Sequence, residues 1–357
     1  MSEAAVLERE EPVAAAGPET LVSVRDLYKH FEIRGGLFGV SRIGAVRAVD
    51  GVTFDIRRGE TLGFVGESGC GKTTLGRLIV NLDRPDSGQV RFDGRDDATL
   101  GREELRARRK SAQLMFQDPY ASLDPRMRIR AILREPLDAQ QIGTRASREA
   151  RIVELLDEVG LSRRALELYP HEFSGGQRQR IGLARALTVE PRLVVADEPV
   201  SALDVSIQSQ ILNLMRRLQA ERSFSYVIIS HDLSVVRYLS DRVGVMYLGK
   251  LVEIGPVLEV YEHTAHPYTA GLLEAIPVPD PHRRRPQGAA VRGELPSAAA
   301  PPSGCRFRTR CQRAEEICAL EEPVLRPFSD NGHEAACHFP LERPADPAAS
   351  SAAAAAG

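Results

Sequence analysis

Short apolar runs alternate with amphipathic stretches from Leu21 to about Ile254, as expected for a sheet that is covered by helices. Three runs predict buried strands, because they are apolar, strand-sized and bounded by glycine or charged residues. They are TLGFV (61–65), LVVAD (193–197) and YVIIS (226–230). Charged residues follow the last two runs, at the strand ends where open α/β sheets bind ligands. Segment 243–255 predicts a hairpin that turns near Gly249, so an α/β core is expected.

Helical periodicity marks the segments around these strands. Residues 72–82 are expected to form a helix directly after a glycine-rich loop. Apolar residues recur at helical spacing in 206–219, which predicts an amphipathic helix with one face in the core. Longer helical patterns, such as 148–161, occupy the range of about 103–189. This range is expected to be a helical subdomain inserted in the α/β core.

Composition divides the chain into units. Residues 1–19 and 341–357 are poor in large apolar residues and are expected to be disordered tails. The main unit is expected to span 20–260. Residues 276–288 are rich in proline and charge, which predicts a linker or extended arm. Beyond it, about 289–340 is expected to be a separate small unit.

The overall balance of residues excludes several classes of protein. A chain of 357 residues that is 43% hydrophobic can bury a full-sized core. Its 47 basic and 49 acidic residues give a formal charge of −2, so no nucleic-acid partner is expected. No stretch approaches the roughly 20 apolar residues of a membrane span. The acidic N-terminus lacks the features of a secretory signal, which favours a reducing location where disulfides are disfavoured.

The segment GESGCGKT (66–73) has the spacing of a phosphate-binding loop, and it stands between a predicted strand and a predicted helix. Backbone N–H groups of such a loop converge on phosphate oxygens. Lys72 would reach the β- and γ-phosphates of a nucleotide, and Thr73 would ligate Mg²⁺. A chance glycine-rich turn is the alternative. The contacts expected from this region are Gly66, Ser68, Gly69, Cys70, Gly71, Lys72, Thr73 and Thr74, with Cys70 a small filler.

An acidic pair ends the second predicted strand. Asp197 is placed to hold the Mg²⁺ shell, and Glu198 to orient or deprotonate an attacking water. Such a pair alone is usually solvated surface. After four apolar strand residues and downstream of a phosphate loop, it predicts a hydrolytic site.

The segment FSGGQRQR (173–180) opens a helix with a serine and two glycines, which makes a second anion-binding helix start that has no lysine. One nucleotide does not need two such cradles from the same chain. The second cradle is therefore expected to serve a nucleotide that another subunit holds.

On these residues the chain resembles the ATP-binding subunits of ABC transporters, over about 21–340. GESGCGKT resembles the Walker A motif and LVVADE the Walker B motif. The other motifs resemble the Q-loop at Gln117, the signature at Ser174, Gly175, Gly176 and Gln177, the D-loop at Ser201, Ala202, Leu203 and Asp204, and the switch histidine at His231. The resemblance implies an α/β P-loop ABC ATPase core with an antiparallel β subdomain and an inserted helical subdomain. A small cysteine-containing extension over 261–340 completes this fold.

The resemblance also implies roles for three single residues. Phe31 matches the aromatic residue that stacks on adenine, with neighbouring Tyr28 as the alternative; from the residue alone, core packing is the simpler reading. His231 would contact the γ-phosphate. Gln117 would sense the metal or water, and the proline-bounded loop after it could receive a helix of a membrane subunit.

Finer similarity indicates the oligopeptide and dipeptide importer branch, at 113–129, 196–214 and 266–277. Residues 33–52 resemble the second of its two ATPase subunits. Asp118 departs mildly from this branch, which often has asparagine there. The expected partners are a second homologous ATPase subunit, two transmembrane permease subunits and an extracytoplasmic solute-binding protein. The chain would lie peripherally on the cytoplasmic face of the cell membrane.

In the implied mechanism, two ATP molecules close a dimer and hydrolysis reopens it. Each nucleotide would contact Lys72 and Thr73 of one chain and Ser174 and Gly176 of the other. The same role for nickel or another small solute is one alternative. A soluble ABC protein of DNA repair or translation is another, although two cassettes or a long coiled coil would then be expected. A regulatory or metal-binding protein without hydrolysis is the third, and the complete set of catalytic residues opposes it.

Four of the five cysteines gather near the end of the chain, at Cys305, Cys311, Cys318 and Cys337. Their spacing is irregular for zinc, and four thiolates could instead hold a [4Fe–4S] cluster, which the resemblance favours. Zn²⁺ or free buried thiols are the alternatives. The arginines at 306, 308, 310 and 313 are expected to favour thiolates by their charge, or else to form a solvated face. His333 and His338 are spare ligands.

Overall fold

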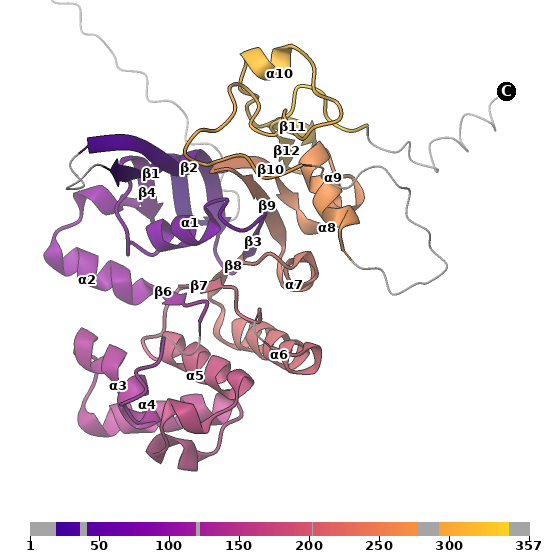
Figure 1. Ribbon diagram of the computed structural model, residues 1–357. Helices are drawn as coiled ribbons and strands as arrows, with labels where there is room; N and C mark the ends of the chain where they lie inside the picture. Colours follow the sequence, from indigo (N-terminus) through magenta and orange to yellow (C-terminus); the bar gives the residue numbers. More distant parts are fainter. Residues whose placement is uncertain (1–18, 36–40, 119–121, 202, 277–292, 343–357) are drawn as a thin grey trace, which may run out of the picture.

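The computed structural model describes residues 19–35, 41–118, 122–201, 203–276 and 293–342 (Figure 1). The side chains of 34–35 and 41–43 are not part of this description. The expected disordered tails and the linker predicted at 276–288 lie almost wholly outside the described residues. Among the described residues, no helix has the length and apolar character needed to span a membrane.

An eight-stranded sheet carries the site, and the predicted strands lie at its centre. Five strands are parallel, in the order β9-β3-β8-β7-β6. Their bounds are β9 Arg242–Tyr247, β3 Thr61–Val65, β8 Ser225–Ile229, β7 Leu193–Asp197 and β6 Ala112–Met115. Because these strands run the same way, their carboxyl ends meet at one edge of the sheet. The predicted hairpin is confirmed, since β9 pairs antiparallel with β10 (Lys250–Pro256).

A second, four-stranded antiparallel sheet packs beside the first, as the resemblance implied. Its order is β2-β1-β4-β5. The bounds are β1 Thr20–Gly35, β2 Ser41–Arg57, β4 Ser87–Phe92 and β5 Arg95–Asp96. Apolar residues of this sheet, of β3 and of helix α1 (Lys72–Ile79) share one buried cluster, which holds the phosphate-loop helix between the two sheets.

The helical part lies below the eight-stranded sheet in Figure 1. It contains α3 (Ile129–Gln140), α4 (Arg145–Glu158) and α5 (Gly175–Leu187). Within the range predicted for the helical subdomain, about 103–189, the structure also has α2 (Arg102–Ser111) and strand β6, which belongs to the main sheet. The inserted helices therefore follow β6.

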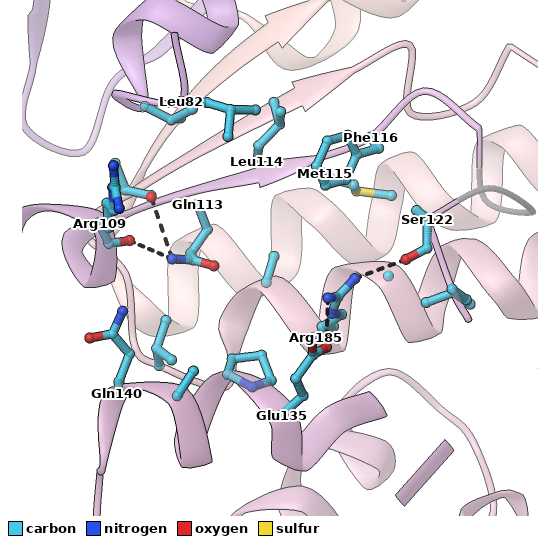
Figure 2. A pocket seen from close by; sticks show the side chains of 18 of the residues that line it. Leu82, Arg109, Gln113, Leu114, Met115, Phe116, Ser122, Glu135, Gln140 and Arg185 are labelled. Atoms are coloured by element: carbon cyan, nitrogen blue, oxygen red, sulfur yellow. Dashed lines mark hydrogen bonds and ion pairs between the residues drawn. The ribbon is translucent and has the colours of Figure 1, made fainter. Parts of the chain in front are cut away.

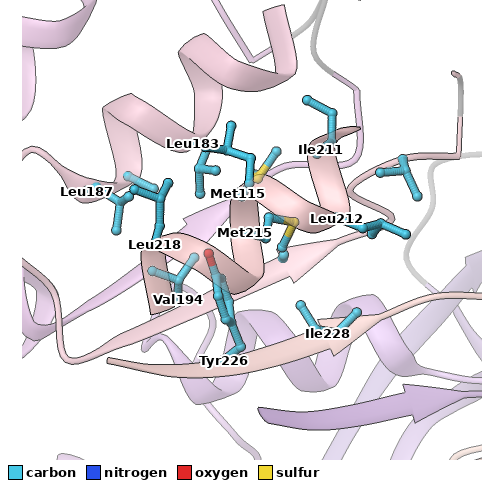
Figure 3. Packing of buried hydrophobic residues seen from close by; sticks show 14 of the residues in the cluster. Met115, Leu183, Leu187, Val194, Ile211, Leu212, Met215, Leu218, Tyr226 and Ile228 are labelled. Carbon is cyan, nitrogen blue, oxygen red and sulfur yellow. The ribbon is translucent and has the colours of Figure 1, made fainter. Parts of the chain in front are cut away.

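A continuous apolar core joins the sheet to these helices. Figure 3 shows Leu183 and Leu187 of α5 near Met215 and Leu218 of α6 (Val205–Arg222), beside Tyr226 of β8. All five side chains are buried. This packing fixes α5 and α6 against the strands of the sheet. The remaining helices of the core are α7 (Leu233–Leu239), α8 (Val257–Glu262) and α9 (Pro267–Glu274).

The C-terminal segment is not the separate unit that the sequence predicted. Its strands β11 (Arg326–Ser329) and β12 (His333–Ala335) extend the eight-stranded sheet, because β12 pairs antiparallel with β10. Helix α10 (Ile317–Leu320) lies above them in Figure 1. At the junction, Nε2 of His333 lies 2.7 Å from a carboxylate oxygen of Glu253, and both side chains are fully buried. We call residues 293–342 the C-terminal lobe.

Candidate functional site

The predicted phosphate loop connects β3 to α1 at the carboxyl edge of the parallel strands. Gly71 caps α1 with a φ of 110°, and a Cβ there would lie 1.8 Å from the carbonyl oxygen of Ala48. Glycine is thus required by both conformation and space. The buried Lys72 ammonium donates to the carbonyl oxygens of Gly66, at 2.7 Å, and Glu67, at 3.1 Å. Cys70 is buried beneath the loop, and burial raises the pKa of its thiol.

Asp197 lies at the end of β7, next to the start of α1. Its carboxylate lies close enough to the Thr73 side chain for that group to lower its pKa. Burial is the main cause that raises its pKa above the usual range, and the charge of Glu198 adds to this, while Thr73 and Lys72 oppose it. Its Oδ1 is buried without a hydrogen-bond partner among the described residues. A divalent cation beside Thr73 would satisfy this oxygen, so the residues present fit Mg²⁺.

Glu198 and His231 form a close pair at the same edge. Nδ1 of His231 lies 2.7 Å from one carboxylate oxygen of Glu198, and the His231 backbone N–H donates to the other at 3.1 Å. The Glu198 side chain is 9% exposed, whereas that of His231 is 60% exposed. Glu198 has a φ of 51°, and its N–H donates to the carbonyl of Ile229. A glutamate is held in the left-handed region only where its surroundings enforce this, which is typical of functional sites.

Two other predicted contacts lie on separate elements. Gln117 follows the end of β6, the parallel neighbour of β7, and is exposed. Phe31 lies on β1 and is 44% exposed, with the Lys29 ammonium 5.6 Å from its ring centre. An exposed aromatic face at this position is available for stacking, while Tyr28, the alternative, packs edge-on to His30.

The signature residues open α5 in a capping box. The Ser174 hydroxyl accepts from the Gln177 N–H, and the Gln177 side chain accepts from the Ser174 N–H at 3.0 Å. Gly176 is buried, since a Cβ there would lie 2.4 Å from Ile207 of α6. Figure 1 shows α5 well separated from α1, so the signature does not meet the phosphate loop of its own chain.

The D-loop lies beside the signature. Asp204 caps α6 by accepting from the Ile207 N–H at 3.0 Å, and a Cβ on Gly175 would lie 3.1 Å from Leu203. The Ser201 hydroxyl donates to the carbonyl of Glu198. Ala202 is outside the described residues. The D-loop therefore connects the acidic pair to the signature within one chain.

A contact that the sequence did not predict reaches the phosphate loop from the C-terminal lobe. Arg310 makes a two-pronged ion pair with the carboxylate of Glu67, the second residue of the loop. The sequence shows an arginine-rich stretch around the cysteines, but nothing in that stretch indicates that Glu67 is the partner of Arg310.

The four terminal cysteines line one small cavity, together with His266, Phe307 and His338. Of the arginines expected to favour thiolates, Arg313 does lower the pKa of Cys311, but burial outweighs it. Burial raises the pKa of Cys305, Cys311 and Cys337, the last to about 11. Among the described residues, no group of three or more histidine, cysteine, aspartate or glutamate side chains is arranged to hold a metal ion.

The four arginines of this segment make different contacts. The buried Arg306 pairs with Asp50 and the carbonyl of Leu248, and Arg308 donates to Ser303. Arg306 and Arg310 thus connect the lobe to the core, whereas Arg308 bonds within the lobe and Arg313 lines the cysteine cavity.

A groove of about 330 Å³ lies between β6, α3 and α5 (Figure 2). Leu82 and Phe116 border it and are about half exposed, at 52% and 46%. Across the groove, Arg185 donates to the carbonyl of Ser122 at 2.9 Å and to Glu135 at 2.8 Å. Phe116, which lines the groove, directly precedes Gln117 in the sequence.

Comparisons with known proteins agree with this geometry. The family model described as ABC transporter matches residues 49–201, and the one described as oligopeptide/dipeptide transporter, C-terminal region, matches residues 252–318. The chain is 51% identical over 334 residues to the oligopeptide transport ATP-binding protein AppF of Bacillus subtilis, covering 92% of this chain and 99% of that protein. It is 52% identical over 317 residues to a putative peptide import ATP-binding protein of Brucella ovis, covering 89% and 97%.

Solved structures show the same fold over the main unit. The dimeric, post-hydrolysis structure of the ATP-binding cassette MJ0796 with ADP and Pi superposes with a TM-score of 0.59 and 28% identity, covering 66% of this chain and 99% of that one. The structure of cbiO1 from Clostridium perfringens gives a TM-score of 0.58 and 26% identity, covering 69% and 92%.

Proposed function

The chain belongs to the ATP-binding subunits of ABC transporters, in the group with the oligopeptide/dipeptide C-terminal region, and from this we propose that it hydrolyses ATP to power peptide import through partner membrane subunits. The names of its relatives in Bacillus and Brucella, which refer to oligopeptide transport and peptide import, support this substrate class. The observation that carries the enzymatic part is the Glu198–His231 pair, which lies beside Asp197 and the phosphate loop.

In the proposed mechanism, Lys72 and the loop N–H groups bind the β- and γ-phosphates, and Phe31 stacks on the adenine. Thr73 and Asp197 would hold Mg²⁺, which when bound neutralises phosphate charge. Glu198 accepts a proton from the attacking water, and His231, the more exposed of the pair, orients this carboxylate and faces the γ-phosphate. Gln117 completes the site at the end of β6.

The second half of each nucleotide site comes from another subunit. Ser174 and Gly176 open a helix that lies away from the chain's own phosphate loop, so they are free to meet a nucleotide held by a facing cassette. The dimeric structure of the MJ0796 cassette supports such an arrangement. We propose a heterodimer with a similar ATPase subunit, a position on the cytoplasmic face of the membrane, and a solute-binding protein in the complex.

The groove beside β6 is proposed as the docking place of a permease subunit. Its exposed Leu82 and Phe116 offer apolar area to an inserted helix, and the Arg185–Glu135 pair can receive polar groups at its rim. Because Phe116 directly precedes Gln117, a displacement of the docked helix would reach the nucleotide site.

A metal centre at the four-cysteine cavity is a second proposal. Four cysteines that lie far apart in the sequence gather at one cavity, and four thiolates are a common ligand set of a [4Fe–4S] cluster, with Zn²⁺ as the alternative. Anaerobically purified protein is expected to absorb light at about 400 nm, and the variant Cys311→Ser is expected to lack this absorption. Colourless protein with stoichiometric zinc would reject the cluster, and protein with neither would reject the metal centre.

The hydrolytic role is tested with Glu198→Gln. This variant is expected to bind MgATP while hydrolysing it at least about 100-fold more slowly, because it loses the general base. Glu221→Gln, at an exposed glutamate of α6, is the matched control and should hydrolyse ATP like the parent. Equal hydrolysis by Glu198→Gln and the parent would contradict the assignment of Glu198.

The substrate class is tested by reconstituting the chain with its neighbouring subunits in vesicles. Peptides are expected to stimulate ATP hydrolysis and to accumulate inside. Stimulation by nickel or another small solute in place of peptides would favour the alternative cargo.

A further inference from the structure

The Arg310–Glu67 ion pair joins two parts of the chain that are 243 residues apart. Nη1 and Nη2 of Arg310 lie 2.7 and 2.9 Å from the two carboxylate oxygens of Glu67. The side chain of Arg310 is 6% exposed and that of Glu67 is 27% exposed. Two parallel hydrogen bonds to a carboxylate fix direction as well as distance, so this contact holds Glu67 in one orientation.

The backbone of Glu67 is held from the same side. Its N–H donates to the hydroxyl of Tyr268 at 2.9 Å, and Tyr268 is fully buried in α9. Its carbonyl accepts from the Lys72 ammonium at 3.1 Å and from the Cys70 N–H at 3.2 Å. Arg310 and Tyr268 therefore fix Glu67, and the carbonyl of Glu67 helps to position the ammonium of Lys72.

Arg310 itself has a rigid support. Phe307, three residues earlier, packs against Tyr247 and Tyr268 with ring centres 5.4 and 5.3 Å apart. The Arg310 N–H donates to the Phe307 carbonyl at 2.9 Å, and its guanidinium lies 5.9 Å from the Tyr247 ring. Aromatic packing of this kind leaves few alternative side-chain positions, so the arginine is presented to the loop already ordered.

Charge gives the contact a second consequence. Glu67 places a negative charge in a loop that must receive a triphosphate, and like charges at close range oppose binding. The guanidinium of Arg310 neutralises this charge at short range. Its pKa is raised, mainly by the hydrogen bond to Glu67, so the guanidinium stays charged at neutral pH.

We infer that Arg310 of the C-terminal lobe is a positioning residue for the phosphate loop, which acts on nucleotide binding by orienting and neutralising Glu67. The inference rests on the proposed function, because it requires the loop to bind MgATP. The C-terminal lobe would thus influence nucleotide affinity through Glu67.

The test uses Arg310→Gln, Arg310→Lys, Glu67→Gln and the double variant in the full chain. Arg310→Gln is expected to raise the Kd and KM for MgATP about tenfold, with kcat at saturation changed less, because an unpaired carboxylate is left beside the phosphates. Arg310→Lys should recover part of the affinity, since it keeps the charge without the fork. Adding Glu67→Gln to Arg310→Gln should bring the Kd back to within about threefold of the parent, because the repelling charge is gone.

Arg308→Gln is the matched control. Arg308 is an arginine of the same segment, but it bonds to Ser303 and not to the phosphate loop. Its Kd for MgATP should equal that of the parent. The inference is overturned if Arg310→Gln binds like the parent, if Arg308→Gln is weakened equally, or if the double variant binds no better than Arg310→Gln.

Two of these measurements separate a failure of the inference from a failure to fold or a failure of the proposed function. If Arg310→Gln fails to fold by circular dichroism, Glu67→Gln alone decides: it removes the repelling charge, so its Kd for MgATP should stay within about threefold of the parent, and a Kd raised about tenfold or more overturns the inference. A parent chain that neither binds nor hydrolyses ATP would instead contradict the proposed function, so the two failures are distinguishable.

Discussion

His266 is buried without charge, and this makes the junction of core and C-terminal lobe sensitive to acid. It is 1% exposed, its Nδ1 accepts from the Tyr268 N–H at 3.1 Å to cap α9, and its ring lies 5.7 Å from Phe307. Burial is the main influence and lowers its pKa from 6.5 to about 4, although the carboxylate of Glu253 opposes this shift. A protonated ring could not accept the capping hydrogen bond.

Proton linkage gives the direction in which the free energy of unfolding changes with pH. The folded pKa lies below the unfolded value, so the unfolded chain binds the proton first as the pH falls. The contribution of His266 is fully present above its unfolded pKa of 6.5 and is lost as the pH falls toward the folded value of about 4. Between about pH 7.5 and about pH 4.5, the free energy of unfolding should fall by about 2.5 kcal/mol through this residue.

Urea unfolding at a series of pH values, followed by circular dichroism, measures this loss. His266→Asn keeps a capping acceptor but cannot titrate here, so it should be less stable at neutral pH and should lack most of the parent's slope in this range. His171→Asn, at an exposed histidine, should retain the parent's slope. A slope in His266→Asn equal to that of the parent would refute the reasoning.

Three other substitutions have definite expected effects. Gly71→Ala should abolish MgATP binding in an equilibrium assay, because its Cβ would meet the Ala48 carbonyl, whereas Gly94→Ala, at another positive φ with no atom within 4 Å, should bind normally. Ser174→Ala should lower the free energy of urea unfolding by about 1 kcal/mol through loss of the cap, and an unchanged value would show that the capping box is not stabilising. Phe307→Ala should cost about 3–5 kcal/mol in the same assay, and a loss below about 1 kcal/mol would contradict the tight aromatic packing.

The central features of the fold could be predicted because their signals are local. The strand at 61–65 and the glycine loop after it are adjacent in sequence, and an apolar run followed by such a loop has one common structure. The helix at 206–219 was equally clear, since its apolar positions recur on one face, although the structure extends it to Val205–Arg222. The hairpin near Gly249 followed from a turn residue between two apolar runs.

The C-terminal lobe could not be placed in the same way. Strand β12 is three residues long, and it pairs with β10 where His333 contacts Glu253, 80 residues earlier in the chain. No periodicity reports such a contact. The proline-rich segment between core and lobe favoured a lobe that is separate from the core. In the structure, the buried contact of His333 with Glu253 joins the lobe to the main sheet.

Arginines near cysteines illustrate why composition alone misleads about charge. A prediction from neighbouring sequence positions pairs the guanidinium groups with the nearest thiols. In the structure, Arg306 and Arg310 instead pair with Asp50 and Glu67 of the core. An ionised carboxylate attracts an arginine more strongly than a buried thiol that stays neutral, so the ion pairs form with the acids. The cysteine-rich segment is therefore attached to the phosphate loop through the ion pair of Glu67 with Arg310, which directly precedes Cys311 in the sequence.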